Sequence, residues 1–301
     1  MSSSSSPGVS LMMEGLSYIA GTEVPCVLID VVRGGPGLGN IAPSQGDYNQ
    51  IVHGGGHGDY HPIVLAPASV QEAIDLTVLA FDLADKYRAI AIVMADGSVG
   101  QIMEPAELPE MRPVKKERPE WAVTGAKDRP ARALSSIYID PVQEEIYNVH
   151  LLNKWYEIMA NEVRYKEYYL DDAEYVVIGY GTAGRVALSA VRAARQAGLK
   201  VGLFRPVSLS PYPMVQVEQL AGTATAFLVV EMNTGQMLED VQRAVKGRVP
   251  IEFYGRLGGM VPYPDDILGE IQRLSSRTLP VDGDPRQRWL ERVNSGELKL
   301  G

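Results

Sequence analysis

The clearest pattern along the chain is a series of short apolar runs that alternate with amphipathic segments. Residues 25–32 (PCVLIDVV) and 89–95 (AIAIVMA) are almost continuously apolar, as in strands that are buried on both faces. Between them, residues 70–84 carry one apolar helical stripe behind a capping box of Ser69 and Glu72. This strand–helix–strand order predicts a parallel α/β sheet in the first part of the chain.

The same alternation returns after residue 171. It predicts a second doubly wound α/β domain, so the fold class is α/β with two such domains. The expected strands are 175–178, 201–204, 226–230 and 251–254, and the expected helices are 183–196, 211–220 and a segment from Asn233 to about Gly247.

Two stretches differ in character from these domains. Residues 103–141, whose first half (103–121) is rich in proline and charge, are expected to form an ordered connector. Residues 143–169 predict one long amphipathic helix across the domain boundary. Residues 275–301 are polar and are expected to form an exposed tail. The apolar side of the long helix would comprise Ile146, Val149, Leu152, Trp155, Met159 and Val163. The predicted division is a first domain at 1–110, connector and helix at 111–170, a second domain at 171–274 and the tail at 275–301.

Composition narrows the class of protein. The 301 residues are 46% hydrophobic and 22% charged, as expected of about two globular domains. The net charge is −9 without a basic run, so we expect no nucleic-acid partner. No apolar run approaches the roughly 18 residues that a membrane span needs, so no membrane partner is expected. The single cysteine, Cys26, excludes an intrachain disulfide and indicates a reducing, cytoplasmic compartment.

Residues 179–184 (GYGTAG) match the G-x-G-x-x-G pattern between an expected strand and an expected helix. This context leaves an NADP-dependent dehydrogenase as an open hypothesis, since amides at a helix N-terminus can hold a diphosphate. The acidic residue that would bind the ribose is expected about 20 residues on, where Arg205 and Pro206 stand instead. A tight turn that needs glycine for close packing is the favoured interpretation.

His53, His57 and His61 have the spacing of metal ligands on one helix face, but glycines between them will not hold a helix. A glycine-rich loop near a subunit contact or an active-site mouth is favoured over a metal site, and no metal ligand is assigned.

Residues 33–40 (RGGPGLGN) follow a buried strand at its carboxyl end, where open α/β sheets bind ligands. The guanidinium of Arg33 would offer a planar fork to a carboxylate. The alternative is a surface loop in which Arg33 pairs with a neighbouring acid. A second loop, 231–236 (EMNTGQ), also follows a strand, and helix capping by Asn233 and Gln236 explains it at least as well as binding does.

Several segments in a fixed order share one further property. They are 2–8 with Glu14 and Gly15, 33–40, 54–60 (GGGHGDY), 65–69 (LAPAS), 204–213 (FRPVSLSPYP) and 231–237 (EMNTGQM). Taken together, they resemble the α subunit of 2-oxoacid:ferredoxin oxidoreductases, and most closely the 2-ketoisovalerate (3-methyl-2-oxobutanoate) branch. The resemblance covers nearly the whole chain up to about Leu274, and it implies an incomplete thiamine-diphosphate pyrimidine-type domain followed by a transketolase C-terminal-like domain.

The resemblance also implies a set of cofactors and partners. Thiamine diphosphate and Mg²⁺ would be bound mainly by a partner β subunit, and iron–sulfur clusters would lie on γ- and δ-type subunits. Coenzyme A would take the acyl group and ferredoxin the electrons. By the family's pattern Arg33 would bind the carboxylate of the 2-oxoacid substrate, and Gly34, Gly35 and Asn40 would shape that pocket.

In the family, the serine-rich segment is preceded by residues that carry the glutamate contacting the cofactor's aminopyrimidine ring, so this glutamate would lie upstream of Met1. We therefore expect the N-terminal part of the first domain to be missing. No catalytic or cofactor-binding residue is therefore assigned here, and the isolated chain is expected to be inactive. An edge of the first sheet is also expected to be exposed. Two alternatives to a ketoisovalerate enzyme subunit stay open: a non-catalytic scaffold of the complex, and the 2-oxoglutarate-specific enzyme.

Overall fold

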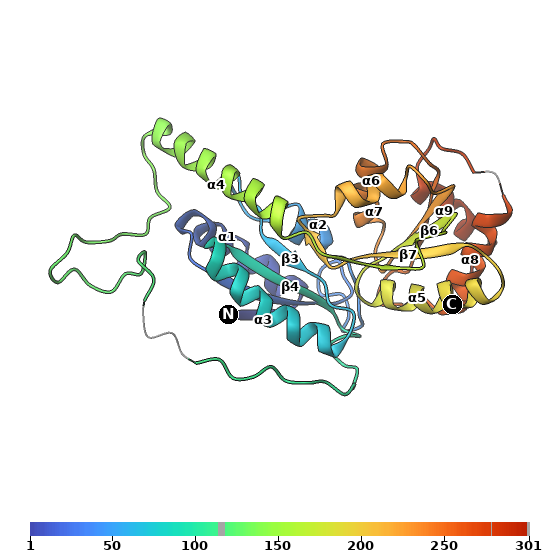
Figure 1. Ribbon diagram of the computed structural model, residues 1–301, viewed down its shortest axis with the longest axis horizontal. Coiled ribbons are helices and arrows are strands. Elements are labelled where there is room, and N and C mark those ends of the chain that lie inside the picture. The colour runs from blue at the N-terminus through green and yellow to red at the C-terminus, as the bar shows by residue number, and fades with distance from the viewer. Residues whose placement is uncertain (114–117, 278, 300–301) are drawn as a thin grey trace.

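The computed structural model describes residues 1–113, 118–277 and 279–299, which form two lobes, each built on a five-stranded sheet (Figure 1). We call the lobe around the sheet β1-β2-β4-β3-β8 the first lobe and the one around β10-β9-β6-β7-β5 the second lobe. The connector and tail expected at 111–170 and 275–301 lie partly outside the described residues.

The first sheet confirms the two strands expected from apolar runs, β2 (Cys26–Val32) and β4 (Ile90–Asp96), which pair in parallel. The capping box is half formed, because the Ser69 Oγ accepts from the Glu72 N–H while the Glu72 carboxylate accepts from the Ala68 N–H. The other parallel strands of this sheet are β1 (Ser2–Ser4), which lies at an edge, and β3 (Ile63–Leu65). One face of the sheet is covered by α1 (Ser6–Thr22) and α2 (Tyr48–Val52), and the other face by α3 (Val70–Tyr87).

The second sheet follows the predicted alternation. Its four parallel strands and the helices between them bury an apolar core that continues into the first lobe. In chain order the elements are β6 (Tyr175–Ile178), α5 (Gly181–Gln196), β7 (Val201–Pro206), α6 (Met214–Leu220), β9 (Ala226–Glu231), α7 (Gln236–Val245), β10 (Ile251–Gly255) and α8 (Pro264–Ser276).

Two short antiparallel strands, which the sequence pattern does not reveal, close the edges of the sheets. β8 (Ser208–Ser210) follows β7 of the second lobe but pairs with β3 of the first. β5 (Tyr165–Tyr168) pairs with β7. The first sheet is therefore completed by a strand from beyond its own domain, which fastens the two lobes together.

The long helix was predicted at 143–169, but α4 (Pro141–Asn161) ends earlier, and β5 takes up the rest of the segment. It lies along the first lobe and away from the second (Figure 1). The predicted apolar side is also wrong, because Leu151 and Ile158 are buried whereas Ile146, Val149 and Leu152 are about half exposed. Polar contacts of α4 with the end of α1 select this orientation. Within the described ranges, no helix has both the length and the apolar character needed to cross a membrane.

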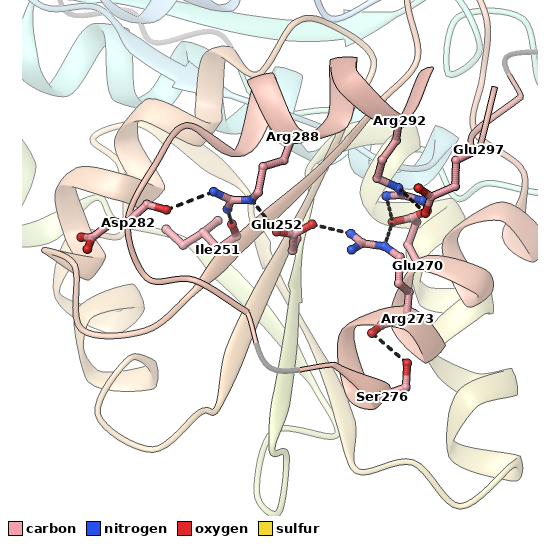
Figure 2. Close-up of polar contacts among 9 residues, drawn as sticks. All are labelled: Ile251, Glu252, Glu270, Arg273, Ser276, Asp282, Arg288, Arg292 and Glu297. Atoms are coloured by element: carbon pink, nitrogen blue, oxygen red, sulfur yellow. Dashed lines mark hydrogen bonds and ion pairs between the residues drawn. The ribbon is translucent and has the colours of Figure 1, made fainter. Parts of the chain in front are cut away.

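The prediction of an exposed tail is also wrong, because α9 (Pro285–Asn294) packs on the second lobe. Trp289 is 5% exposed and meets Phe253 edge-on, with ring centroids 5.6 Å apart. Arg288 Nε donates to Glu252 Oε1 (2.8 Å) and Arg292 Nη2 to Glu270 Oε1 (2.6 Å), as Figure 2 shows. The polar sequence of this segment is compatible with docking because its arginines form ion pairs with the second lobe while Trp289 packs into the core.

Candidate functional site

A pocket of about 640 Å³ lies where the carboxyl ends of strands from both sheets meet. Its walls come from the start of α1, the loop after β2, the start of α2, and the loops after β9 and β10. Arg33 and Asp47 are the two ionisable side chains among its lining residues. This position agrees with the general rule that α/β sheets bind ligands beyond the carboxyl ends of their strands.

Arg33 is half-buried at the end of β2, and its guanidinium is anchored along one edge. Its Nε donates to Ser5 Oγ (3.2 Å), and its Nη1 donates to the carbonyl oxygens of Leu38 and Asn40. Its Nη2 makes no hydrogen bond with any residue that the structure describes. The loop therefore holds the planar fork in place and leaves one of its nitrogens for a ligand.

The glycine-rich loop packs tightly behind Arg33. A Cβ on Gly34 would lie 2.5 Å from Asn40 Oδ1, and one on Gly39, where φ is +55°, would lie 1.8 Å from the Gly34 carbonyl oxygen. Asn40 Nδ2 donates to the Gly258 carbonyl of the second lobe (2.8 Å). Of the residues predicted for this pocket, Arg33 and Gly35 line it, whereas Gly34 and Asn40 support the loop from behind.

The start of the chain contributes to the pocket only from Ser6 onward. Met1 is exposed next to the edge strand β1, and it does not line the pocket. Glu14 within α1 and Glu23 at the end of that helix also lie outside the lining. No glutamate among the described residues lines this pocket, so no catalytic residue is assigned. The location of the family's glutamate upstream of Met1 stays a prediction.

A pair of carboxyl groups beside Arg33 was missed by the sequence reasoning. Asp30 is fully buried within β2, and Asp47 precedes α2 and lines the pocket. Burial, with the neighbouring Asp47 carboxyl, raises the pKa of Asp30 to about 8. Burial also raises the pKa of Asp47, against the opposing effects of Ser6, Asp30 and Arg33. The available signal was an acid inside an otherwise apolar strand, PCVLIDVV.

The second glycine-rich turn, 179–184, is closed. Asp96 accepts hydrogen bonds from Thr182 N (3.2 Å) and Thr182 Oγ1 (2.8 Å), and so fills the helix N-terminus that a diphosphate would need. A Cβ on Gly184 would lie 2.4 Å from the Gly179 carbonyl oxygen. Arg205 is buried and pairs with Glu72 at 2.6 Å. These contacts favour the tight-turn interpretation over dinucleotide binding.

The three histidines have different surroundings. His53 Nε2 lies 2.9 Å from Asp240 Oδ2, and His61 stacks on Trp155. His57 lines a separate pocket between α1 and α4. Among the residues that the structure describes, no group of three or more His, Cys, Asp or Glu side chains is arranged to hold a metal ion.

The loop after β9 combines capping with a place in the pocket. Asn233 Oδ1 accepts from the backbone N–H groups of Gly235 (2.7 Å) and Gln236 (3.0 Å), which is the capping expected from the sequence. Glu231 adds a second cap, since its carboxylate accepts from Met237 and Leu238. Asn233 and Gln236 also line the Arg33 pocket, so both interpretations of this loop describe part of its role.

A larger pocket, of about 880 Å³, lies beneath α4 near the amino end of β4. It is lined by Arg88, Lys154 and Trp155 among others. Lys154 already pairs with Glu23 at 2.7 Å. Because the carboxyl ends of the strands are the usual ligand site of this sheet type, position outweighs size, and the Arg33 pocket is the stronger candidate.

Comparison with known proteins gives concordant matches over both lobes. Residues 1–169 match the family model described as pyruvate flavodoxin/ferredoxin oxidoreductase, thiamine diphosphate-binding. Residues 173–267 match the pyruvate:ferredoxin oxidoreductase core domain II.

Among curated relatives, the ketoisovalerate oxidoreductase subunit VorB of Methanothermobacter thermautotrophicus is 47% identical over 91% of this chain and 78% of its own. The 2-oxoglutarate synthase subunit KorA of Methanothermobacter marburgensis is 35% identical over 90% and 79%. Among solved structures, the 2-oxoglutarate:ferredoxin oxidoreductase of Magnetococcus marinus matches with a TM-score of 0.72 and 25% identity. That match covers 90% of this chain and about half (52%) of the other.

Proposed function

Since this chain belongs to the pyruvate flavodoxin/ferredoxin oxidoreductase family, as an α-type subunit of a 2-oxoacid:ferredoxin oxidoreductase, we propose that it serves the oxidative decarboxylation of 2-ketoisovalerate. The product would be the acyl-coenzyme A thioester, with ferredoxin as electron acceptor. The choice of 2-ketoisovalerate rests on the 47% identity to the ketoisovalerate oxidoreductase subunit, against 35% to the 2-oxoglutarate synthase subunit.

One observation carries the proposal within this chain, namely Arg33 held at the rim of the pocket with its Nη2 left for a ligand. The N–H groups of a guanidinium nitrogen donate charge-assisted hydrogen bonds to a carboxylate, and Nη2 has both of its N–H groups for this purpose. Anchoring by Ser5 and by the loop carbonyls fixes the orientation of the fork, so a bound 2-oxoacid would present its carbonyl carbon in a defined direction.

The lining of the pocket fits part of thiamine diphosphate. The cofactor's thiazolium ring supplies an electron sink for the carbanion that decarboxylation leaves. Polar side chains such as Ser44, Gln50 and Asn233 suit a heterocyclic ring. The lining holds one cation, Arg33, and the described residues contain no cluster of metal ligands. Such a lining does not suit a diphosphate with Mg²⁺. We therefore assign the diphosphate and Mg²⁺ to a partner β subunit.

The remaining cofactors require further chains. Because a cluster needs about four thiolates and this chain has one cysteine, we place the iron–sulfur clusters on γ- and δ-type partners. The same lone cysteine supports a cytoplasmic location.

The 2-oxoglutarate-specific enzyme is the second candidate, supported by the match to the 2-oxoglutarate:ferredoxin oxidoreductase structure. Its substrate carries a second carboxylate and would need a second cation. Arg33 is the one cation that lines the pocket within the described residues, which favours a substrate with an apolar side chain.

The test is reconstitution of the complex from this chain and its partner subunits, with viologen reduction as the readout. We expect coenzyme A-dependent turnover with 2-ketoisovalerate and a lower kcat/KM with 2-oxoglutarate. Arg33→Ala should lower kcat/KM about 100-fold, because it removes the charged hydrogen bonds to the carboxylate. Arg112→Ala, which removes an exposed arginine paired with Asp82, is the matched control. An unchanged KM in the Arg33 variant would refute the assigned role, and a complex that assembles without turnover would identify a scaffold.

A further inference from the structure

The Asp30 and Asp47 carboxyl groups have no use in the function proposed so far. Neither oxygen of Asp30, nor Oδ2 of Asp47, meets a hydrogen-bond donor in good geometry among the described residues. Asp30 is fully buried, so water does not solvate it. Its pKa reflects burial, the Asp47 carboxyl and the backbone N–H of Ser6. Two acids in contact, with three of their four carboxyl oxygens lacking a donor in good geometry, are best explained by a proton held between them.

The physical reason is electrostatic. Two carboxylates in contact repel each other, and Asp30 has lost its water while Asp47 is partly shielded from it, so the cost of ionising both is high. One proton shared between them supplies the missing hydrogen bond and removes one charge. The pair then titrates as a unit, and its second proton is lost at higher pH than for an ordinary aspartate.

We propose that Asp30 and Asp47 form a proton-sharing pair that sets the charge of the Arg33 pocket, admitting an anionic 2-oxoacid while it holds its proton and opposing it once fully ionised. This rests on the function proposed above. Asp47 lines the pocket, so its charge reaches the ligand directly, whereas Asp30 acts through Asp47 and is a positioning residue.

The net charge at the pocket depends on how many protons the pair holds. With one proton, the pair carries one negative charge against one positive charge on Arg33. Full ionisation leaves one negative charge in excess, close to the place where a carboxylate would bind. Tyr180, from the start of α5, also faces Asp47, but burial raises its pKa well above the usual value and keeps it neutral. The lining residues from the loops after β9 and β10 carry no ionisable side chain.

The experiment measures kcat/KM for the 2-oxoacid against pH, from about pH 6.5 to about pH 9.5, in the reconstituted complex. For the unsubstituted protein we expect kcat/KM to fall about tenfold as the pH rises past the pKa of the pair, which is about 8. Asp47→Asn should remove this fall, because no carboxylate then lines the pocket. Asp30→Asn should shift the fall to lower pH, because Asp47 then ionises alone beside Arg33. Asp75→Asn, on the exposed side of α3, is the matched control and should keep the original profile.

A profile that falls equally in the unsubstituted protein and in Asp47→Asn would overturn the proposal, as would a flat profile in the unsubstituted protein. Should Asp30→Asn not fold, the comparison with Asp47→Asn decides alone. A second readout does not need turnover: infrared difference spectra of the complex should show a protonated carboxyl band near neutral pH that disappears above about pH 8. In Asp30→Asn the band should disappear at lower pH, because Asp47 then ionises alone beside Arg33. If the band behaves so but no 2-oxoacid is turned over, the proposed function fails while the proton-sharing pair stands. If turnover is normal but the band is absent, only the pair is refuted.

Discussion

Two glycine-rich turns follow the carboxyl ends of strands in this molecule, and only one of them borders a pocket. The turn at 33–40 opens onto a pocket of about 640 Å³ and holds an arginine at its rim. The turn at 179–184 is filled by Asp96 and by its own backbone. The turn at 179–184 matches a known nucleotide-binding fingerprint, although Arg205 and Pro206 stand where its acidic residue is expected and a tight turn was therefore favoured.

The difference lies in what the opposite lobe brings to each turn. Asp96, at the end of β4, reaches across to α5 and supplies the negative charge that a helix N-terminus favours. Asn40 of the Arg33 loop donates to the Gly258 carbonyl of the second lobe, and this contact leaves the pocket beside the loop open. Glycine therefore allows close backbone packing at both turns, and the partner residues decide which turn is filled and which borders a pocket. Three substitutions test this comparison, and a fourth, Glu270→Gln, tests the ion pairs of the second lobe.

The largest effect is expected from Asp96→Ala, which breaks the closure of the turn at 179–184. It leaves buried donors on Thr182, Ser98 and Val99 without an acceptor. We expect a loss of about 4 kcal/mol in the free energy of unfolding, measured by urea denaturation. Asp96→Asn, which keeps one acceptor oxygen, should lose about half as much. Equal stability of the two variants would mean that the carboxylate is not the cap.

Gly184→Ala tests the backbone part of the same closure. The new Cβ would meet the carbonyl oxygen and carbon of Gly179 at 2.4 and 2.8 Å, and neither atom can rotate away. We expect a loss of about 3 kcal/mol, read as a lower urea midpoint. Gly269→Ala, at a helix position with nothing within 4 Å, is the matched control and should gain up to about 1 kcal/mol.

Glu270→Gln tests how much the ion pairs of Glu270 with Arg273 and Arg292 stabilise the second lobe (Figure 2). Burial alone would raise the pKa of Glu270, but Arg292 and Arg273 outweigh it, so the pKa in the folded protein is below the usual value. The stabilisation is therefore present above the unfolded-state pKa, about 4.3, and is lost as the pH falls through the folded-state pKa.

At pH 7 we expect Glu270→Gln to lose about 2 kcal/mol in the free energy of unfolding. Below about pH 4.5 its stability should depend on pH less steeply than that of the unsubstituted protein, by up to about 1.4 kcal/mol per pH unit. Urea midpoints measured from pH 3 to pH 7 would show this. Parallel curves for the two proteins would mean that Glu270 does not contribute to acid sensitivity.

The smallest effect is expected from Asn40→Ala, which cuts the tie between the Arg33 loop and the second lobe. Loss of the bonds to Gly258 and Ala42 should cost about 1 kcal/mol. Because Arg33 contacts the Asn40 carbonyl, the loop should loosen and raise the KM for the 2-oxoacid about fivefold, with kcat little changed. A change in stability without a change in KM would show that the tie does not position Arg33.

Several features were predictable because they are local. Continuous apolar runs identified β2 and β4, and a serine before an amphipathic stripe identified the start of α3. β8 was missed because three residues carry too little periodicity to predict a strand. α9 was missed because most of its side chains are polar, and its ion pairs to Glu252 and Glu270 resemble surface charge in the sequence although Trp289 is buried. The α4 stripe was misassigned because Glu23 selects a different face.

The same division applies to the candidate site. The chain's residues pointed to the Arg33 loop as a ligand site or a surface ion pair, and the resemblance to the family assigned the substrate carboxylate to Arg33, which stays a prediction. Folding decided the rest: that Asp47 lies beside Arg33, that Asp30 beside Asp47 is fully buried, and that Asp96 closes the other turn. Those relations join residues far apart along the chain, and a pKa or a filled helix terminus depends on distance and burial, which exist only once the lobes have packed together.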